Sequence, residues 1–531
     1  MSKIQSSRQS HFAITPAVNH PRAAYNCDHG YKATFNAGKL IPFFWDEVSP
    51  GDTHKVSTTA FIRFATLLFP LLDNVRFYTH YFFVPTRLVW DNSKKFFGEQ
   101  VNPGDSIDYT VPSMTSTVTT GYDEGSIFDY FGLPTKVAGY DHISLPLRCY
   151  NLCFNEWFRD QNIQDSVTVN TGDTSDAATD YTLLSSCKIR DYFTSGLPFT
   201  QKGNPVTIPL GTTAPVIGDT VNAPNWTNDA NTYQMFMNSG DPHVAWGGTP
   251  SSSGTSALKL SNQTASGMIV DLSEASSATI NDLRNSFQVQ RFLERDARNG
   301  TRYSELVNSH FGVNFPDLRY RPEYLGGSSD PLHISVVAQT SGTGQTGQVT
   351  PAASLSGFGT AVLHDHGYNK SFTEHGYVIG IILARADLNY QQGLNKKWTR
   401  SIRYDYPWPV LAHLGEQPIL NKELYVQGTA GGTADEGVFA YNERYAECRY
   451  RPSVITSLFR SNATLSLDAW HLAQDFADLP TLSPTFIVDN PPTDRVKATT
   501  GDPDFIMDMQ IRQTTVSCLP AYSVPGYIDH F

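Results

Sequence analysis

Short runs of apolar residues, some of them alternating with polar ones, recur along the chain and predict β-strands. Residues 74–85 (NVRFYTHYFFVP) combine β-branched and aromatic side chains and end on a proline. Residues 375–388 (HGYVIGIILARADL) are apolar enough for a central strand. The runs at 455–460 (ITSLFR) and 463–473 (ATLSLDAWHLA) continue the pattern. Turn sequences such as SPGD and NPGD stand between the runs, so most of the predicted regular structure is β.

Helices are predicted at fewer places. Over 144–160, apolar residues recur every three or four positions, as on one face of a helix. A second helix is predicted over 279–300 and a third over 301–312, each ending at a glycine, which is favoured just beyond a helix. The charged stretch ERDARNGTRYSELVNSHFGV (294–313) therefore spans two helix ends joined at an Asn-Gly corner.

The segment 201–266 is the least core-like part of the sequence. It has almost no charge and many Gly, Ser, Thr, Asn and Pro residues, and it is far longer than an ordinary loop. Trp226, Tyr233, Phe236 and Trp246 lie within it and favour a structured insertion over a linker. We predict a surface protrusion here.

Several strands, few helices and long insertions together predict an all-β core, a sandwich or barrel decorated with loops. The length of 531 residues exceeds the usual size of one core, so either several domains or one domain with large insertions is expected. No repeat of 20–50 residues is visible, which argues against propellers and solenoids.

The charge of the chain is low and unevenly placed. Charged residues make up 17% of the sequence, against about 25% in typical soluble proteins, which suggests a surface largely covered by other protein copies. The net charge is −12, yet residues 1–40 hold five basic residues and one acid, a local charge of +4. This basic arm, with Lys3, Arg8 and Arg22, is either a solvated tail or a segment that meets phosphate.

The six cysteines form neither a CxxC pair nor a disulfide framework, so reduced, buried cysteines and folding in a cytosol are expected. The first residues contain no apolar signal-peptide core, and no run of 18 apolar residues occurs. We therefore expect a protein that does not insert into a membrane.

Three common catalytic and nucleotide-binding patterns do not occur. The sequence has no GxxxxGK[ST], no GxGxxG after a strand and no GxSxG, which disfavours P-loop and nucleophile-elbow enzymes. We predict no catalytic activity and no cofactor.

The stretch 294–313 invites comparison with an active site because acids, arginines, a serine and a histidine crowd together. Over 281–310 five arginines stand against four acids, and such balanced charges usually form ion pairs within helices or between subunits. Catalysis would require a convergence that sequence cannot show. The predicted subunit-interface residues are Arg291, Arg295, Arg298, Arg302, Glu305 and His310.

A weak metal-site candidate lies at HDHGYNKSFTEHGY. His364 and His366 would share one face of a strand, and Glu374 and His375 could return from a hairpin. This candidate supports an alternative function, a jelly-roll carbohydrate-binding or cupin-like metal-binding protein. Interface or turn structure is the more ordinary interpretation of these residues.

Basic and aromatic residues interleave over 385–409 (RADLNYQQGLNKKWTRSIRYDYPWP). Phosphate contacts from basic side chains and base stacking on aromatic ones are what single-stranded nucleic acid binding uses. Lys396, Lys397 and Arg400 are therefore candidate DNA-facing residues. The alternative is an exposed linker whose aromatic side chains pack in a protein interface.

Four segments carry a resemblance to a known family. ERDARNGTRYSELVNSHFGV, KSFTEHGYVIGIILARADLNYQQGLNKKW, NERYAECRYRPS and the terminal VPGYIDHF resemble signature segments of the major capsid proteins of gokushoviruses. These are microviruses, small icosahedral bacteriophages with single-stranded DNA. The resemblance runs nearly from end to end and extends to the N-terminal HFAITPAVNHPRAAYNCDHGYKATFNAGKLIPFFWDEVSPGDT.

The resemblance implies an eight-stranded antiparallel jelly roll with long insertions and a few short helices. It implies a T=1 shell of sixty copies around circular single-stranded DNA, assembled in the bacterial cytoplasm. Further implied partners are an internal scaffolding protein, a small basic DNA-binding protein and a host receptor or glycan. The domain organisation expected is an arm (1–40), a first core part (41–200), a threefold-axis protrusion for host attachment (201–266) and the remaining core (267–531).

Overall fold

The computed structural model describes residues 22–206, 280–313, 320–340 and 353–522, together with six short strands between residues 216 and 270. The chain divides into two compact units. The first comprises Met1–Thr200 and Gly300–Phe531, and the second comprises Gln201–Asn299. The second unit begins at the residue where the predicted protrusion begins, and the four-part division of the chain stays a prediction.

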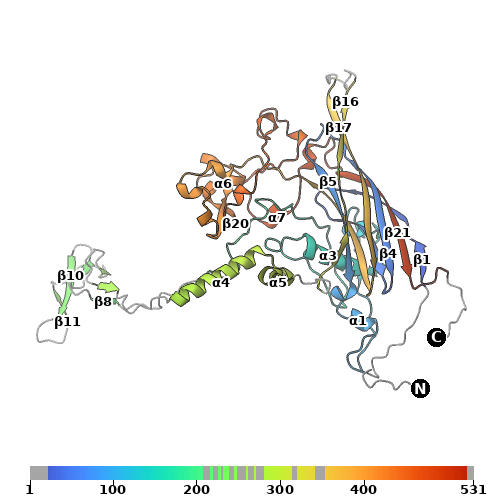
Figure 1. Cartoon of the computed structure of the whole chain (residues 1–531), viewed down its shortest axis with the longest axis horizontal. Coiled ribbons are helices and arrows are strands. Elements are labelled where there is room, and N and C mark those ends of the chain that lie inside the picture. The colour runs from blue at the N-terminus through green and yellow to red at the C-terminus, as the bar shows by residue number, and fades with distance from the viewer. Residues whose placement is uncertain are drawn as a thin grey trace, which may run out of the picture. The chain divides into compact units, whose positions relative to one another are not determined.

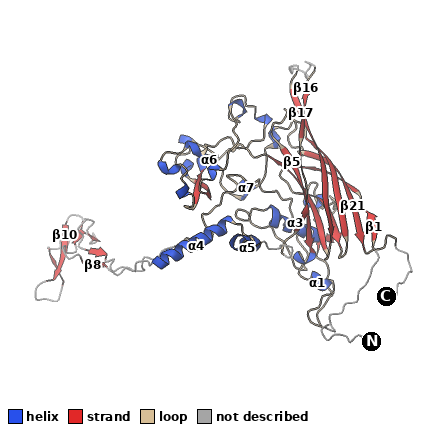
Figure 2. Ribbon diagram, viewed as in Figure 1, coloured by secondary structure: helices blue, strands red, loops and turns tan. Residues whose placement is uncertain are grey.

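The first unit contains two large antiparallel sheets (Figures 1 and 2). One has the order β1–β21–β4–β17–β16, and β2 also pairs with β21. Along β4 and β21 buried and exposed residues alternate, so this sheet packs one face into the core and exposes the other. We call it the open-faced sheet. Its strands are β1 (Ala23–Asn26), β2 (His29–Phe35), β4 (Thr53–Phe64), β16 (His333–Ala338), β17 (Leu355–Ser371) and β21 (Phe505–Ser517).

The second sheet has the order β14–β5–β18–β3, and β15 also pairs with β5. In β18 every residue except Arg385 is buried, which explains the long apolar run of this segment, since both of its faces are covered. We call it the covered sheet. Its strands are β3 (Ile41–Val48), β5 (Val75–Pro85), β14 (Glu323–Gly326), β15 (Ser329–Pro331) and β18 (Gly376–Ala386).

The main hydrophobic core lies between the two sheets. It contains Phe43 of β3, Ile62 of β4, Phe77 of β5, Leu363 of β17 and Phe505 of β21, all almost fully buried. Side chains from both sheets thus interdigitate in one layer, as in a β-sandwich. The predicted all-β core with a few short helices is confirmed.

A long insertion covers the outer face of the covered sheet. A second hydrophobic cluster of the chain joins Trp90 and Tyr150 of the insertion to the covered sheet. Its partners there are Phe82 on β5 and Ile379 and Leu383 on β18. The predicted helix over 144–160 is confirmed, as α3 followed by one π-helical turn, Phe154–Phe158. The elements of the insertion are α1 (Ser93–Phe96), β6 (Ser113–Thr115), α2 (Ile127–Tyr130), β7 (Asp141–Ile143) and α3 (Leu145–Cys153).

A fully buried ion pair fastens this insertion. Arg148 on α3 donates from Nε and Nη2 to the two carboxylate oxygens of Asp176, each at 2.7 Å, and both side chains are 0% exposed. Arg148 Nη1 donates to the carbonyls of Val89 and Gly172, and Tyr181 donates to Asp176 at 2.7 Å. The pair therefore leaves few hydrogen-bonding groups unused, which is the condition for a stable buried charge.

A third, smaller hydrophobic cluster lies away from the sandwich core. Tyr192, Tyr390, Ile419, Phe439 and Phe486 form its centre. Figure 1 shows its elements around α6 and β20, drawn in orange. The cluster holds together β19 (Glu416–Leu420), α6 (Asn421–Leu424), β20 (Val438–Glu443) and α7 (Pro484–Ile487).

The strand predictions were partly right. The strands predicted over 74–85 and 375–388 are confirmed as β5 and β18. Those over 455–460 and 463–473 were wrong, since both stretches form loops with single 3-10 turns. Here Ser466 Oγ donates to the carbonyl of Arg460 and accepts from the amide of Asp468, and such local bonds compete with strand pairing.

Both helices predicted around the Asn-Gly corner are confirmed. In the second unit α4 spans Ile280–Arg298, and in the first unit α5 spans Tyr303–Phe311. Gly300 and Gly312 have φ of +96° and +68°, the left-handed conformation that glycine adopts beyond a helix end. The second unit also contains β8 (Val216–Gly218), β9 (Asn225–Asn228), β10 (Asn231–Met237), β11 (Val244–Gly247), β12 (Lys259–Leu260) and β13 (Met268–Val270).

The expectation for the cysteines is corrected by the structure. Cys149 and Cys153 are buried on α3, but Cys27, Cys448 and Cys518 are exposed, so the expectation of buried cysteines was wrong for these three. Within the described ranges no helix is both long and apolar enough to cross a membrane.

Candidate nucleic-acid interface

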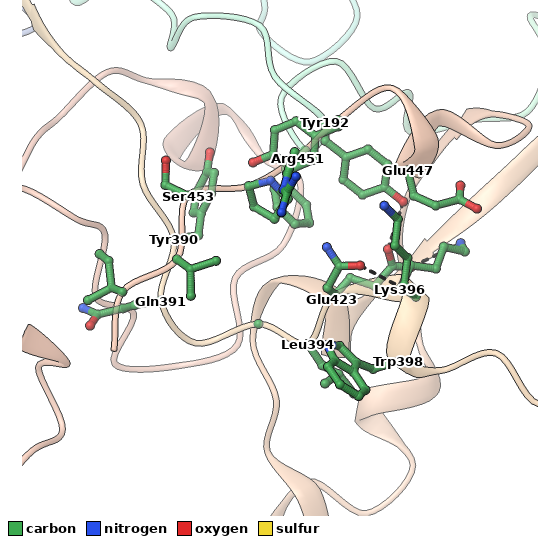
Figure 3. Close-up of a pocket in the computed structure, with 18 of the residues that line it drawn as sticks. Tyr192, Tyr390, Gln391, Leu394, Lys396, Trp398, Glu423, Glu447, Arg451 and Ser453 are labelled. Atoms are coloured by element: carbon green, nitrogen blue, oxygen red, sulfur yellow. Dashed lines mark hydrogen bonds and ion pairs between the residues drawn. The ribbon is translucent and has the colours of Figure 1, made fainter. Parts of the chain in front are cut away.

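A pocket of about 650 Å³ lies beside the third hydrophobic cluster (Figure 3). Its walls come from four separate stretches of the chain, and the predicted DNA-facing residues Lys396 and Lys397 are among them. Aromatic and basic side chains make up about half of the lining. They include Tyr192, Phe193, Tyr390, Lys396, Lys397, Trp398, Tyr450, Arg451 and Arg460, together with the acids Glu423 and Glu447.

Lys396 is held by a buried carboxylate. Its Nζ lies 3.2 Å from Glu423 Oε1 and donates to the carbonyl of Pro418 at 2.8 Å. Glu423 is almost fully buried and also accepts from Tyr192 at 2.9 Å. Figure 3 shows the lysine and the carboxylate side by side. Lys396 therefore neutralises a buried acid and contributes little free positive charge.

Arg400 is engaged in the same way. Its Nη2 lies 3.1 Å from Glu447 Oε1, and Gln417 donates to the other oxygen of Glu447 at 2.7 Å. Burial by itself would raise the pKa of Glu447, but hydrogen bonds from Gln417 and Arg400 lower it. Arg400 also lies over the ring of Tyr406 at 5.4 Å, so its second role is to orient an aromatic side chain.

Lys397 is one of the basic side chains of the pocket that face solvent, together with Arg451 and Arg460. The side chain of Asn395 caps the 3-10 turn Lys396–Trp398 by accepting from the amide of Lys397 at 3.0 Å. Lys397 is exposed, and within the described chain no carboxylate lies at ion-pair distance from it. Trp398, beside Leu394 in Figure 3, is 81% exposed. A cation and an indole ring are thus presented next to each other.

Three more aromatic residues extend this surface along the chain. Tyr404, Tyr406 and Trp408 are all exposed, and Arg403 lies over the Trp408 ring at 4.9 Å. Exposed rings with interleaved arginines can stack bases and contact phosphates. The same surface could also be covered by a neighbouring protein, because aromatic residues and arginine are enriched in interfaces.

Some residues of this pocket were missed by sequence reasoning. Arg451, Tyr450 and Arg460 belong to a stretch 40 or more residues further along the chain, and Tyr192 comes from a much earlier part of the chain. The signal that could have pointed to them is the ECRYR sequence at 447–451, which repeats the basic and aromatic alternation. The predicted DNA-facing Arg22 precedes β1 and does not line the pocket, and Lys3 and Arg8 lie outside the described residues.

We predict that Lys397→Gln combined with Trp398→Ala weakens binding of a fluorescent single-stranded oligonucleotide roughly tenfold at low salt, since one phosphate contact and one stacking surface are lost. Fluorescence anisotropy of the purified chain measures this. The salt dependence of binding should also become shallower. Lys55→Gln, an exposed lysine of β4, is the control and should not change either quantity. Equal affinities for all three proteins would contradict the assignment.

The four weak metal candidates do not come together. His364 and His366 are exposed on one face of β17, as the strand pattern predicts. Glu374 instead accepts from Arg87 at 2.7 Å, and the ring of His375 stacks on Phe97 at 3.7 Å. Among the described residues, no group of three or more His, Cys, Asp or Glu side chains is placed to hold a metal.

The predicted subunit-interface residues lie on two helices. Arg302 immediately precedes α5 and pairs within its own chain, with Glu156 at 3.0 Å and with Glu305 at 2.8 Å. Glu305 also accepts from the amide of Arg302 and so caps the helix. His310 lies in the last turn of α5, and the other three lie on α4: Arg291, Arg295 and Arg298. Their contact with another subunit stays a prediction.

The four aromatic residues of the predicted protrusion lie on strands of the second unit. Trp226 of β9 is opposite Tyr233 of β10, and Trp246 of β11 is opposite Met235. Phe236 is also on β10. The segment therefore contains regular β structure, as the aromatic residues indicated.

Antiparallel β-sandwiches with long insertions recur in the coat proteins of viruses, and comparison with known proteins places the chain among them. The family model described as capsid protein (F protein), from phages, matches residues 13–527. The chain therefore belongs to the phage capsid (F protein) family, and its role is structural. Membership in this family implies assembly of the chain with itself into a shell and a place in the virion.

Full-length relatives narrow the family further. The chain is 42% identical to the capsid protein VP1 of Chlamydia phage 1, over 99% of this chain and 98% of that protein. It is 43% identical to the capsid protein VP1 of Bdellovibrio phage phiMH2K over the full length of both. Identity to the capsid protein VP1 of Spiroplasma virus 4 is 34%, over 99% of each chain. All three are gokushovirus proteins, so the predicted resemblance is confirmed.

Proposed function

We propose that sixty copies of this chain build a T=1 icosahedral shell around circular single-stranded DNA, assembled in the cytoplasm of a host bacterium. The observation that carries the proposal is the end-to-end similarity to capsid proteins of small phages. A shell of this size requires one self-complementary subunit with several different contact surfaces.

We infer that the sandwich is an eight-stranded jelly roll. In chain order, its strand positions are β2, β3, β4, β5, β14 with β15, β17, β18 and β21. The first and the last are neighbours in the open-faced sheet, in the order β2–β21–β4–β17. The second and the seventh are neighbours in the covered sheet, in the order β3–β18–β5–β14. Pairing of early strands with late ones supports the jelly-roll assignment.

The open-faced sheet offers an apolar surface that suits subunit contact. Phe61 on β4 lies directly beside Val362 on β17, and both are about half exposed. Ile506 on β21 and Phe358 on β17 are 57% and 40% exposed. Contiguous exposed apolar residues on a protein surface usually mark an interaction site. With the charged residues of α4 and α5, they are our candidates for contacts between copies.

The inner surface of the shell would contact DNA through the Lys396–Trp408 segment and the basic N-terminal arm. Both segments are rich in basic residues, although the chain as a whole has a net negative charge. An internal scaffolding protein would guide assembly, and a small basic protein would share the neutralisation of the packaged DNA. The weak net positive charge of the pocket fits such a division of labour, because its Lys396 and the nearby Arg400 already pair with buried acids.

The segment 201–266 would form the protrusion at the threefold axes and attach to the host. Its hydroxyl and amide side chains suit hydrogen bonding to a surface glycan. Its aromatic residues would supply stacking surfaces.

Electron microscopy of the chain expressed together with its scaffolding protein tests the shell directly. Closed particles of one uniform size, consistent with sixty subunits, are expected. Phe61→Glu should prevent closure, and Lys55→Glu, an exposed position on the same face of the same strand, should not. Open sheets, tubes or soluble monomers from the unaltered chain would contradict the proposal.

A further inference from the structure

A second pocket has no lining residue in common with the candidate nucleic-acid interface. It encloses about 400 Å³ next to the π-helical turn that follows α3. Six basic side chains and three carboxylates line it, so positive charge is in excess. The basic residues are Arg159, Lys188, Arg190, Arg302, Arg321 and Arg385, and the acids are Glu156, Asp160 and Glu305.

The excess persists when the neighbours of the pocket are included. Asp489 lies behind it, 3.6 Å from Arg385, and Asp191 is a second acid near Lys188, so the formal excess falls from three charges to one. Burial lowers the pKa of Lys188 to about 8, so this side chain is still mostly protonated at neutral pH. Arg190 is 74% exposed and only loosely engaged, at 4.0 Å from Asp160. The pocket therefore favours an anion.

An aromatic pocket adjoins the charged one. It encloses about 260 Å³ and shares Trp157, Phe158 and Arg385 with it, and its remaining walls are His80, Phe82 and Tyr324. Ring centroids in this group lie 5–6 Å apart, for example 5.5 Å between Phe82 and Tyr324. Tyr324 and Trp157 are 43% and 37% exposed, so one side of the aromatic pocket is open to solvent.

Two side chains, Arg321 and His80, each lie close to a residue that both pockets share. Arg321 lines the charged pocket and lies over the Trp157 ring at 4.6 Å. His80 lines the aromatic pocket, and burial together with the nearby Arg385 lowers its pKa to about 4. His80 is therefore neutral at pH 7, when one ring nitrogen donates and the other accepts a hydrogen bond. The His80 ring can therefore form hydrogen bonds with the edge of a planar heterocycle.

We propose that the two pockets together bind one nucleotide, with its base in the aromatic pocket and its phosphate in the charged pocket. The carboxylates of an acidic peptide would pair with the arginines, but such a peptide would leave the five aromatic side chains of the aromatic pocket without a ligand to stack on. The nucleotide is either free in solution or part of a single strand, because both carry the same base and phosphate chemistry. The site is independent of shell formation, since it rests on side chains of one chain.

Isothermal titration of the full-length, unassembled chain with dAMP, with inorganic phosphate and with a short oligodeoxyadenylate tests the site. The variants are Arg190→Gln, which changes a largely exposed side chain, and Tyr324→Leu, which removes one aromatic wall. The matched controls are Arg512→Gln on the exposed face of β21 and Tyr522→Leu, whose side chain is 90% exposed. Thermal unfolding of each variant checks that the fold is kept.

Binding of dAMP that is weakened roughly tenfold by each site variant and by neither control is the expected result. Binding of dAMP alone identifies a free nucleotide, and binding of both dAMP and the oligonucleotide identifies a nucleotide of a strand. The proposal is overturned if dAMP does not bind at millimolar concentration. It is equally overturned if phosphate binds as tightly as dAMP with no effect of Tyr324→Leu.

Discussion

Replacing Arg148 with alanine should lower the free energy of unfolding by about 3–5 kcal/mol, because it leaves the carboxylate of Asp176 buried without its cation. The side chains of Arg148 and Asp176 are both 0% exposed and are joined by two hydrogen bonds of 2.7 Å. The arginine also ties down the carbonyls of Val89 and Gly172. The loss therefore extends to the whole insertion that covers the outer face of β5 and β18.

Urea unfolding of the unassembled chain, followed by tryptophan fluorescence, measures this change. Arg76→Ala is the matched control, because Arg76 is an exposed arginine on β5, and surface substitutions usually change stability by less than about 0.5 kcal/mol. Limited proteolysis should cut the Arg148→Ala chain within residues 86–184 much faster than the control. Equal unfolding midpoints for the two variants would refute the role given to the buried pair.

The same ion pair should leave a signature in the pH dependence of stability. Burial by itself would raise the pKa of Asp176, but hydrogen bonds from Arg148, Tyr181 and Ser144 bring it below its ordinary value of 3.8. A carboxyl with a depressed folded-state pKa stabilises the protein above its unfolded pKa, and this contribution is lost as the pH falls through the folded pKa. Arg148→Ala should therefore flatten the loss of stability on acidification below pH 4.

Deletion of residues 207–266, with a short Gly-Ser connection in their place, should leave shell formation intact. Adsorption to host cells should fall by roughly two orders of magnitude, because each particle loses many weak contacts together. The first unit, which contains the β-sandwich and all three hydrophobic clusters, does not include this segment. Its low charge and its hydroxyl and amide side chains motivate the role in attachment.

Adsorption is measured as the loss of free particles after mixing with cells, and electron microscopy confirms that the shells are closed. Trp226→Ala with Trp246→Ala is a milder version of the deletion and should give part of the effect. Trp398→Ala, an exposed tryptophan of the first unit, serves as the control and should adsorb normally. Unchanged adsorption by the deletion variant would exclude the segment from attachment.

Local sequence signals predicted several elements correctly because local energetics decide them. The β-branched and aromatic run at 74–85 is β5, and the apolar run at 375–388 is β18, in which every residue except Arg385 is buried. Gly300 and Gly312 adopt the left-handed conformation that ends a helix. In each case the preference lies in the residues themselves, so a reader of the sequence can find it.

The alternation at 455–473 misled the prediction because its polar side chains bond to their own backbone. Ser466 and its neighbours form local turns, and no partner strand adds to them. The predicted metal site does not form because distant residues engage two of its candidates. Arg87 donates a hydrogen bond to Glu374, and the ring of Phe97 stacks on His375.

The sequence by itself determined the strand-rich architecture, the main helices and the capsid family, because these depend on local preferences and on many residues at once. Only the tertiary structure decided which charges are free to act. Lys396 and Arg400 look as available as Lys397 in the sequence, yet each meets a buried carboxylate, 27 and 47 residues away. Arg302 likewise meets Glu156 across 146 residues. Whether a charge is neutralised depends on which distant residues folding brings within a few ångströms, and spacing along the chain does not contain that information.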